Sequence, residues 1–340
     1  MNIKEQLSAW TALGEILAEE LPLSLQESVE KSHTSNPWFS LENISNAIKQ
    51  NAQNLTRENL EEWLSPYKDK LNSPRTRKNV SIVMAGNIPL VGFHDFLCVL
   101  LSNHSVLAKL SHQDCHLLPT IAKMLCDIEP RFSERIRFTT DKIAGFDAVI
   151  ATGSNNTSRY FDYYFGKYPN LIRKNRNSIA VLTGNESEAE LSALADDVFL
   201  YFGLGCRSVS KIFVPKDYDF ENLRKAFNRY SHLIEHPKHS MNYTYYKAIY
   251  AMNDIQWHDL SNILLVENTS LSAPPAILNY SHYTKVEEIN SFIEFQLDSL
   301  QCVASSDKRI KSSIPFGTAQ SPKLNDYADD IDTLMFLLDL

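Results

Sequence analysis

The 340-residue sequence lacks the features that mark membrane-spanning, secreted or nucleic-acid-binding proteins. No uninterrupted apolar stretch reaches the roughly 20 residues that a bilayer span needs. The first ten residues, MNIKEQLSAW, contain no apolar core of the kind found in a signal peptide. The formal net charge of −8 leaves no excess of basic residues to cover a phosphate backbone. We therefore expect no membrane span and no nucleic-acid partner.

Cysteine is scarce and irregularly spaced. The chain has five cysteines, none of them in a CxxC pair. An odd number without such pairs argues against both a disulfide framework and a metal knuckle. The expected location is the reducing cytoplasm, where most of these thiols would be inert.

Apolar residues make up 44% of the chain and charged residues 22%, which predicts a folded protein with a well-packed core. Its length suggests about two domains. Residues 1–75 are predicted to be helical, because apolar residues recur at helical spacing in LSAWTALGEIL and Thr56 can cap TRENLEEWL. Nothing in this region suggests chemistry, so it is interpreted as a scaffold.

From residue 80 onward, short apolar runs alternate with segments of helical length. The runs are VSIVMA, SVLAKLS, FDAVIATG, SIAVLTG and SKIFVP. This alternation predicts an α/β fold whose strands are parallel. The C-terminal segment is strongly apolar, and we expect it to form a strand that pairs elsewhere in the chain or across a subunit boundary.

The segment YFGLGCRSVSKIFVP places Cys206 directly after Gly205 and close to Gly203. Glycines let the backbone approach a ligand closely, and a cysteine in such a loop can act as a nucleophile. Arg207 can lower the pKa of that thiol. The alternative is a buried structural cysteine beside a glycine turn.

Three further motifs follow predicted strands. Asn87 in GNIPLVG can donate to an oxyanion, or it can simply bond its own backbone. Lys109 can contact ribose or phosphate, or it can be solvated. The turn at Gly153 and Ser154 opens a helix whose N–H groups can attract phosphate. The chain has no GxGxxG motif and no Walker loop, but these three motifs would line one edge of one sheet.

A competing motif is HLIEH, His232 to His236, which fits a zinc-ligand pattern of peptidases. On a helix its two histidines would share a face, and its glutamate could activate water. However, Pro237 follows at once, which predicts that the helix ends there. Histidines at the end of a surface helix are the simpler interpretation.

The order of the motifs resembles the aldehyde dehydrogenase superfamily, and within it the LuxC-type acyl-CoA reductases. GNIPLVG, ATGSNNTSRYF, NRNSIAV, GLGCRSVSKIFVP and a late PFG containing Phe316 carry this resemblance. It implies a nucleotide-binding α/β domain over residues 76–185 and a catalytic α/β domain over residues 186–312. Residues 313–340 would form a tail that returns to the first domain or to a partner subunit.

The resemblance also implies roles for individual residues. Cys206 corresponds to the nucleophile. Asn87 and the backbone N–H of Cys206 correspond to the oxyanion donors. Lys109 corresponds to the ribose or phosphate contact, and Gly153 and Ser154 to the turn near the pyrophosphate.

Three departures from the superfamily pattern refine the prediction. The stretch Leu171–Ser178 contains no acid where oxidising members have a glutamate that activates water, so hydrolysis is disfavoured. Ser111 and His112 stand where an acid usually binds the adenosine ribose, which favours NADPH over NADH. The Glu-Phe-Gly motif that contacts the other ribose has no clean match.

The predicted function is NADPH-dependent reduction of a fatty acyl thioester, carried by coenzyme A or a carrier protein, to an aldehyde through an acyl-cysteine. The first alternative is an acyl-transferring partner subunit that keeps the acyl-cysteine without reducing it. The second is a zinc hydrolase at HLIEH. A homo-oligomer is compatible with either acyl-cysteine hypothesis.

Overall fold

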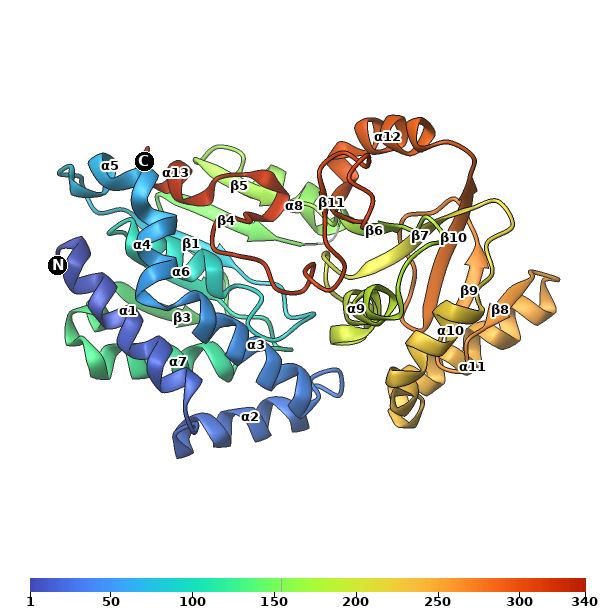
Figure 1. Cartoon of the computed structure of the whole chain (residues 1–340). Coiled ribbons are helices and arrows are strands. Elements are labelled where there is room, and N and C mark those ends of the chain that lie inside the picture. Colours follow the sequence, from blue (N-terminus) through green and yellow to red (C-terminus); the bar gives the residue numbers. More distant parts are fainter. Residues whose placement is uncertain (154) are drawn as a thin grey trace. The chain divides into compact units, whose positions relative to one another are not determined.

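The computed structural model describes residues 1–153 and 155–340 and divides the chain into two units. The first unit comprises Met1–Asn175 and Lys323–Leu340, and the second comprises Arg176–Pro322. Each unit contains its own β-sheet (Figure 1). Among the helices in the described part of the chain, none combines the length and apolar character needed to cross a bilayer.

The first unit begins with the predicted helical region. Its helices are α1 (Ile3–Ala18), α2 (Leu23–Ser35), α3 (Leu41–Asn54), α4 (Arg57–Leu64) and α5 (Lys68–Asn72), with the 3₁₀ turn η1 (Ser65–Tyr67) between the last two. Asn2 and Glu5 form a capping box that begins α1. Thr56 caps α4 as predicted, because its hydroxyl accepts from the backbone N–H of Asn59 at 3.4 Å.

In the part of the chain that the structure describes, a parallel sheet with strand order β3-β2-β1-β4-β5 forms the centre of the first unit. The strands are β1 (Asn79–Val83), β2 (Ser105–Lys109), β3 (Ile136–Thr139), β4 (Ala148–Thr152) and β5 (Asn170–Arg173), joined through α6 (Phe93–Leu101), α7 (Leu117–Ile128), η2 (Pro130–Arg135) and α8 (Asn155–Phe165). The chain moves outward from β1 to β2 and β3, and then returns to β4 on the other side of β1. The carboxyl ends of β1 and β4 therefore flank a topological switch point, where open α/β sheets bind ligands.

Aromatic packing joins the helical scaffold to this sheet. Trp10 of α1 is fully buried, and its ring meets Phe93, Phe96 and Phe132 in edge-on contacts with centroid separations of 5.9–6.2 Å. Such edge-on pairs stabilise a core beyond the area that they bury.

The second unit contains a sheet of order β12-β11-β6-β7-β10-β9-β8, in which only β8 runs antiparallel among the strands described. Its strands are β6 (Asn177–Val181), β7 (Val209–Pro215), β8 (Trp257–Asp259), β9 (Leu264–Glu267), β10 (Ile277–Tyr283), β11 (Leu300–Ala304) and β12 (Ser313–Ile314). Its helices are α9 (Glu188–Phe199), η3 (Leu200–Gly203), α10 (Glu221–Phe227), η4 (Asn228–Glu235), α11 (Pro237–Met252), α12 (Val286–Phe295) and η5 (Leu297–Ser299). The helix α12 packs Ile289 and Ile293 onto the apolar face of the strands.

The structure differs from the sequence-based expectations in two places. The strand of SIAVLTG, which the sequence placed before the domain boundary at residue 185, pairs with β7 and β11 and lies in the second unit. The expectation of a C-terminal strand is wrong, because the tail forms η6 (Ala328–Asp330) and the helix α13 (Thr333–Leu338). Asp332 caps α13 by accepting from the backbone N–H of Met335 at 2.8 Å. Both tail elements lie in the first unit, where α13 packs against α6.

Candidate active site

Cys206 lies on a tight turn directly before β7. The backbone N–H of Ser208 donates to the carbonyl of Gly205 at 3.0 Å, which leaves Cys206 and Arg207 as the two central residues of the turn. Cys206 forms no disulfide, and its exposure is intermediate. Ser178 of β6 donates its hydroxyl to the carbonyl of Cys206 at 2.9 Å. The turn is therefore tied to the neighbouring strand while its cysteine remains partly accessible.

The backbone that leads into this turn is strained. Tyr201, Phe202 and Gly203 have φ values of 56°, 56° and 73°, and the first two are left-handed without being glycine. Both aromatic side chains are buried, and the Phe202 ring lies 4.5 Å from the ring of His236. Packing of this kind can hold a backbone conformation that is sparsely populated in free chains, and such strain is concentrated at functional sites.

A second thiol lies beside the turn. The guanidinium of Arg207 donates to the sulfur of Cys302 on β11 at 3.2 Å. This contact brings Arg207 to a cysteine that the sequence did not single out. The effect of Arg207 on the pKa of the Cys206 thiol stays a prediction.

A buried carboxyl group connects the late PFG motif to α9. Asp197 is fully buried and accepts from the backbone N–H groups of Gly317 at 2.6 Å and Ala319 at 3.0 Å. Burial raises the pKa of Asp197 to about 7, although both backbone donors oppose that change. None of the sequence motifs indicated Asp197. Its signal was a charged residue beside Leu194 and Val198 on the apolar face of a helix.

Asn87 is half-buried and lies on the segment that follows β1. The backbone N–H of Leu90, a residue with φ of 58°, donates to the carboxyl group of Asp114 at 2.8 Å. A Cβ at Gly86 would lie 2.6 Å from the Cβ of Ser111, so only glycine fits there. The segment that carries Asn87 is thus held against the residues that follow β2. Asp114 is not part of any motif that the sequence indicated, and burial raises its pKa to about 6.

Lys109 closes β2, and its ammonium group donates to the carbonyls of Thr140 at 3.0 Å and Asp141 at 2.8 Å. It is half-buried rather than fully solvated. Since an ammonium group has three N–H bonds, these two contacts leave one donor for a further acceptor.

The remaining cofactor candidates follow β2 and β4. Ser111 accepts from the backbone N–H of Gln113 at 3.2 Å, and His112 is exposed. Gly153 follows the carboxyl end of β4, and its N–H donates to the carbonyl of Arg173 at 3.4 Å. Ser154 lies outside the described residues. The candidates that follow β1, β2 and β4 thus share one edge of the first unit's sheet, whereas Cys206 belongs to the second unit.

The stretch that lacks the superfamily's water-activating acid contains a buried cation. Arg173 forms an ion pair with Asp95 at 2.6 Å and donates to the hydroxyl of Thr333 at 2.7 Å. Both charged side chains are 6% exposed, so the pair is a structural tie within the first unit.

The HLIEH segment does not form the helix that a zinc site would require. His232 to Glu235 lie in the 3₁₀ helix η4, and His236 instead caps α11, which begins at Pro237. No group of three or more histidine, cysteine, aspartate or glutamate residues is placed to hold a metal in residues 1–153 and 155–340.

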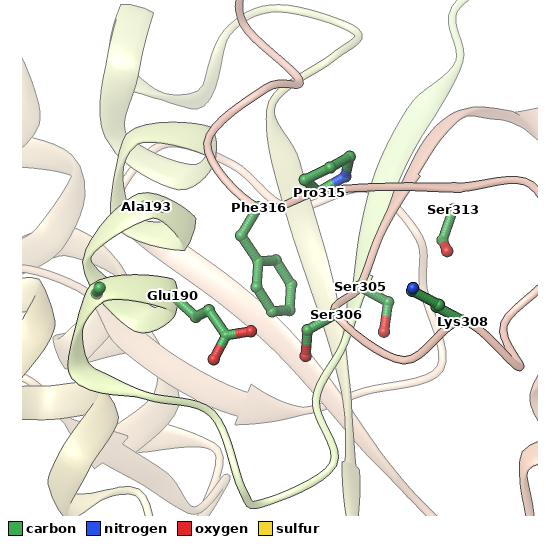
Figure 2. A pocket seen from close by; sticks show the side chains of 9 residues that line it. Glu190, Ala193, Ser305, Ser306, Lys308, Ser313, Pro315 and Phe316 are labelled. Carbon is green, nitrogen blue, oxygen red and sulfur yellow. The ribbon is translucent and has the colours of Figure 1, made fainter.

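The second unit also contains an open pocket of about 480 Å³, lined by Ala189, Glu190, Ala193, Ser305, Ser306, Lys308, Ser313, Pro315 and Phe316. Figure 2 shows the Phe316 ring between Glu190 on one side and Ser305 and Ser306 on the other. Ser305 and Ser306 follow the carboxyl end of β11, whereas Cys206 precedes the amino end of β7. Because these strands run in the same direction, the pocket and the cysteine lie at opposite ends of the sheet.

The family model for acyl-CoA reductase (LuxC) matches residues 14–229, which is more than half of the chain. The chain belongs to the LuxC acyl-CoA reductase family. The matched range includes Asn87, Lys109 and Cys206, and the predicted resemblance is confirmed. Membership supports chemistry of the acyl-CoA reductase or aldehyde dehydrogenase type.

Solved structures similar to this family member are aldehyde dehydrogenases. One from Bacillus cereus, solved as an NAD⁺ complex, has a TM-score of 0.64 and 12% identity over 92% of this chain and 73% of that one. Aldehyde dehydrogenase 21 from Physcomitrella patens, solved with its reaction product succinate, has a TM-score of 0.61 and 10% identity over 98% of this chain and 87% of that one. AldH from Staphylococcus aureus, in a substrate-bound state, has a TM-score of 0.56 and 14% identity over 93% of this chain and 79% of that one.

These similarities confirm the predicted α/β fold of the aldehyde dehydrogenase type. No curated protein sequence is significantly similar to this LuxC family member.

Proposed function

We propose that this LuxC family member reduces a fatty acyl thioester to an aldehyde with NADPH, through an acyl group held on Cys206. The observation that carries the proposal is a partly exposed cysteine, outside any disulfide, at the centre of a tight turn within the range that the acyl-CoA reductase model matches. The strained backbone that precedes this turn is of the kind that is concentrated at functional sites.

The residues at the edge of the first sheet fit a nicotinamide cofactor. The switch point between β1 and β4 is the general ligand position of such sheets, and a similar aldehyde dehydrogenase was solved with NAD⁺. Lys109, Ser111, His112, Gly153 and Ser154 are the residues that would hold it. When bound, the reduced cofactor supplies the hydride for the acyl carbon.

NADPH is favoured by the turn that follows β2. The nearest carboxyl group in this turn, that of Asp114, is buried and accepts from Leu90, so it is directed into the protein. Ser111 and His112 carry no negative charge, whereas an acid at their position would repel a 2′-phosphate.

In the proposed reaction the thiolate of Cys206 attacks the carbonyl carbon of the thioester. Asn87 and the backbone N–H of Cys206 stabilise the oxyanion. The bond from the acyl carbon to the carrier sulfur breaks, and the carrier leaves as a thiolate. After hydride transfer, the thiohemiacetal collapses to aldehyde and returns the electron pair to the Cys206 sulfur. The missing acid in Leu171–Ser178 protects the acyl-cysteine from hydrolysis.

The test mixes the protein with a radiolabelled long-chain acyl-CoA and follows both the acylation of the protein and the oxidation of NADPH. We expect the wild type to do both, and Cys206→Ala to do neither. Cys126→Ala is a matched control, because it removes another thiol of intermediate exposure, on α7. Labelling of the Cys206→Ala protein would contradict the assignment of the nucleophile.

The same assay separates the remaining alternatives. Acylation without oxidation of NADPH or NADH would indicate an acyl-transferring partner subunit instead of a reductase. Faster oxidation of NADH than of NADPH would contradict the cofactor preference alone.

A further inference from the structure

The turn that carries Cys206 is held by a side chain from a distant part of the second unit. Gln320 is buried, and its amide group donates to the hydroxyl of Ser208 at 3.0 Å and to the carbonyl of Asp197 at 3.3 Å. The hydroxyl of Ser208 in turn accepts from the backbone N–H of Gly205 at 3.2 Å. Gly205 and Ser208 are the two ends of the turn whose central residues are Cys206 and Arg207.

The segment that supplies Gln320 is itself fixed against α9. The Asp197 carboxyl group accepts from Gly317 and Ala319, so both of its oxygens are used on this segment. Gly317 has a φ of 80°, and a Cβ added there would lie 2.9 Å from the Cβ of Ala193. A continuous path of hydrogen bonds therefore runs from α9 through residues 317–320 to both ends of the cysteine turn.

We propose that Gln320 and Ser208 are positioning residues, which act through the turn to set the direction of the Cys206 sulfur and of the Cys206 backbone N–H. This inference rests on the proposed function, because it assigns the N–H to the oxyanion and the sulfur to the attack. Neither residue needs to touch the substrate.

The expected effect is on the chemical step. Each hydrogen bond contributes only modestly to stability. A displacement of about 1 Å at a reacting group, however, can lower a rate by about a hundredfold. Loss of the Gln320 amide removes its hydrogen bond to Ser208, so the Cys206 turn can move away from its position. We therefore expect kcat to fall by about tenfold or more while KM changes little.

The experiment compares Gln320→Leu, Ser208→Ala and Ser208→Thr with the wild type in the full-length protein. Ser208→Thr keeps the hydroxyl group and should keep most of kcat, whereas the other two should lose it. Thr318→Val is a matched control, since its hydroxyl donates to the carbonyl of Pro315 in the same segment. Ser210→Ala is a second control, since its hydroxyl donates to the carbonyl of Leu271 at 2.7 Å and, more weakly, to that of Ser178 at 3.5 Å, and leaves the Ser178 hydroxyl on the turn in place.

A second readout does not depend on reductase activity. The rate of iodoacetamide alkylation at Cys206, resolved by peptide mass spectrometry, is measured against pH. We expect Gln320→Leu and Ser208→Ala to move the midpoint of this profile, because a loosened turn changes the surroundings of the Cys206 sulfur, and the pKa of a thiol depends on its surroundings. Ser208→Thr and both controls should keep the wild-type midpoint. Thermal unfolding, measured in parallel, sets a temperature at which every variant is folded.

Three results would overturn the inference. They are an unchanged kcat and alkylation midpoint in folded Gln320→Leu, equal losses in Ser208→Ala and Ser208→Thr, or an equal loss in the Thr318→Val control. If the wild type forms no acyl-enzyme, the proposed function fails, and the alkylation profiles still decide whether the turn is positioned by Gln320.

Discussion

Asp197 and Asp114 are buried carboxyl groups whose pKa values are raised to about 7 and about 6, chiefly because burial disfavours the charged form. In an unfolded chain an aspartate has a pKa of about 3.9. Between these values the folded protein holds protons that the unfolded chain has released. The stability that these protons contribute is complete below about pH 4 and is lost as the pH rises through the folded-state pKa values.

We therefore predict that Asp197→Asn weakens the pH dependence of the free energy of unfolding. Between about pH 5 and about pH 8, the free energy of unfolding of the wild type should fall by on the order of 1–4 kcal/mol more than that of the variant. Urea unfolding at several pH values measures this difference. Asp298→Asn, which alters an exposed carboxyl group, should keep the wild-type slope. Identical slopes for Asp197→Asn and the wild type would refute the role of Asp197.

At the scale of elements, the approach of the 317–320 segment to α9 depends on one glycine. Gly317→Ala should destabilise the protein by about 1–3 kcal/mol, because it adds a close contact with Ala193 to the strain of a left-handed alanine. Gly184→Ala is the matched control, because its φ of 89° imposes a similar backbone strain while its nearest neighbours lie at 3.8 Å and 3.9 Å. Equal shifts in thermal unfolding for the two variants would show that the close contact with Ala193 has no effect.

The sequence predicted most of the elements that carry the candidate site. The runs that end near Val83, Lys109 and Thr152 form strands because their apolar and β-branched residues are buried in a parallel sheet. The C-terminal run was misassigned because a short apolar segment has no clear periodicity. The N-cap at Asp332 favours a helix over Thr333–Leu338.

The residues that support the site could not be predicted in the same way. Gln320 reaches Ser208 across 112 positions of sequence, and no local pattern encodes such a contact. In the sequence Asp114 is only one acid in a polar turn. The hydrogen bond that it accepts from the Leu90 N–H depends on the left-handed backbone of Leu90. Local sequence patterns indicate candidate reactive groups, whereas the groups that orient them depend on the tertiary fold.

At the scale of the whole molecule, the first unit is built from both ends of the chain. Tyr67 donates to Asp332 at 2.7 Å, and Trp63 donates to the hydroxyl of Tyr327 at 2.8 Å. The buried pair of Arg173 and Asp95 extends this connection to Thr333. The last 18 residues, Lys323–Leu340, thus belong to the same unit as the first 175.

We predict that Arg173→Ala destabilises the first unit by about 3–5 kcal/mol, because it leaves the carboxylate of Asp95 buried without its cation. Arg131→Ala, which breaks the partly exposed pairs with Glu129 and Glu5, should cost less than about 1 kcal/mol. Urea unfolding followed by tryptophan fluorescence compares the two variants, since Trp10 and Trp63 both lie in the first unit. Similar losses for both variants would show that the buried pair adds nothing to stability.

The return of the tail has a consequence for biosynthesis. On the ribosome, the partners of Tyr67 and Arg173 emerge only after residues 176–322 have been translated. Residues 1–175 therefore lack their contacts with residues 323–340, and part of their apolar surface stays exposed, until the second unit has been synthesised. Nascent chains stalled before residue 323 should be more sensitive to protease in residues 1–175 than released full-length protein.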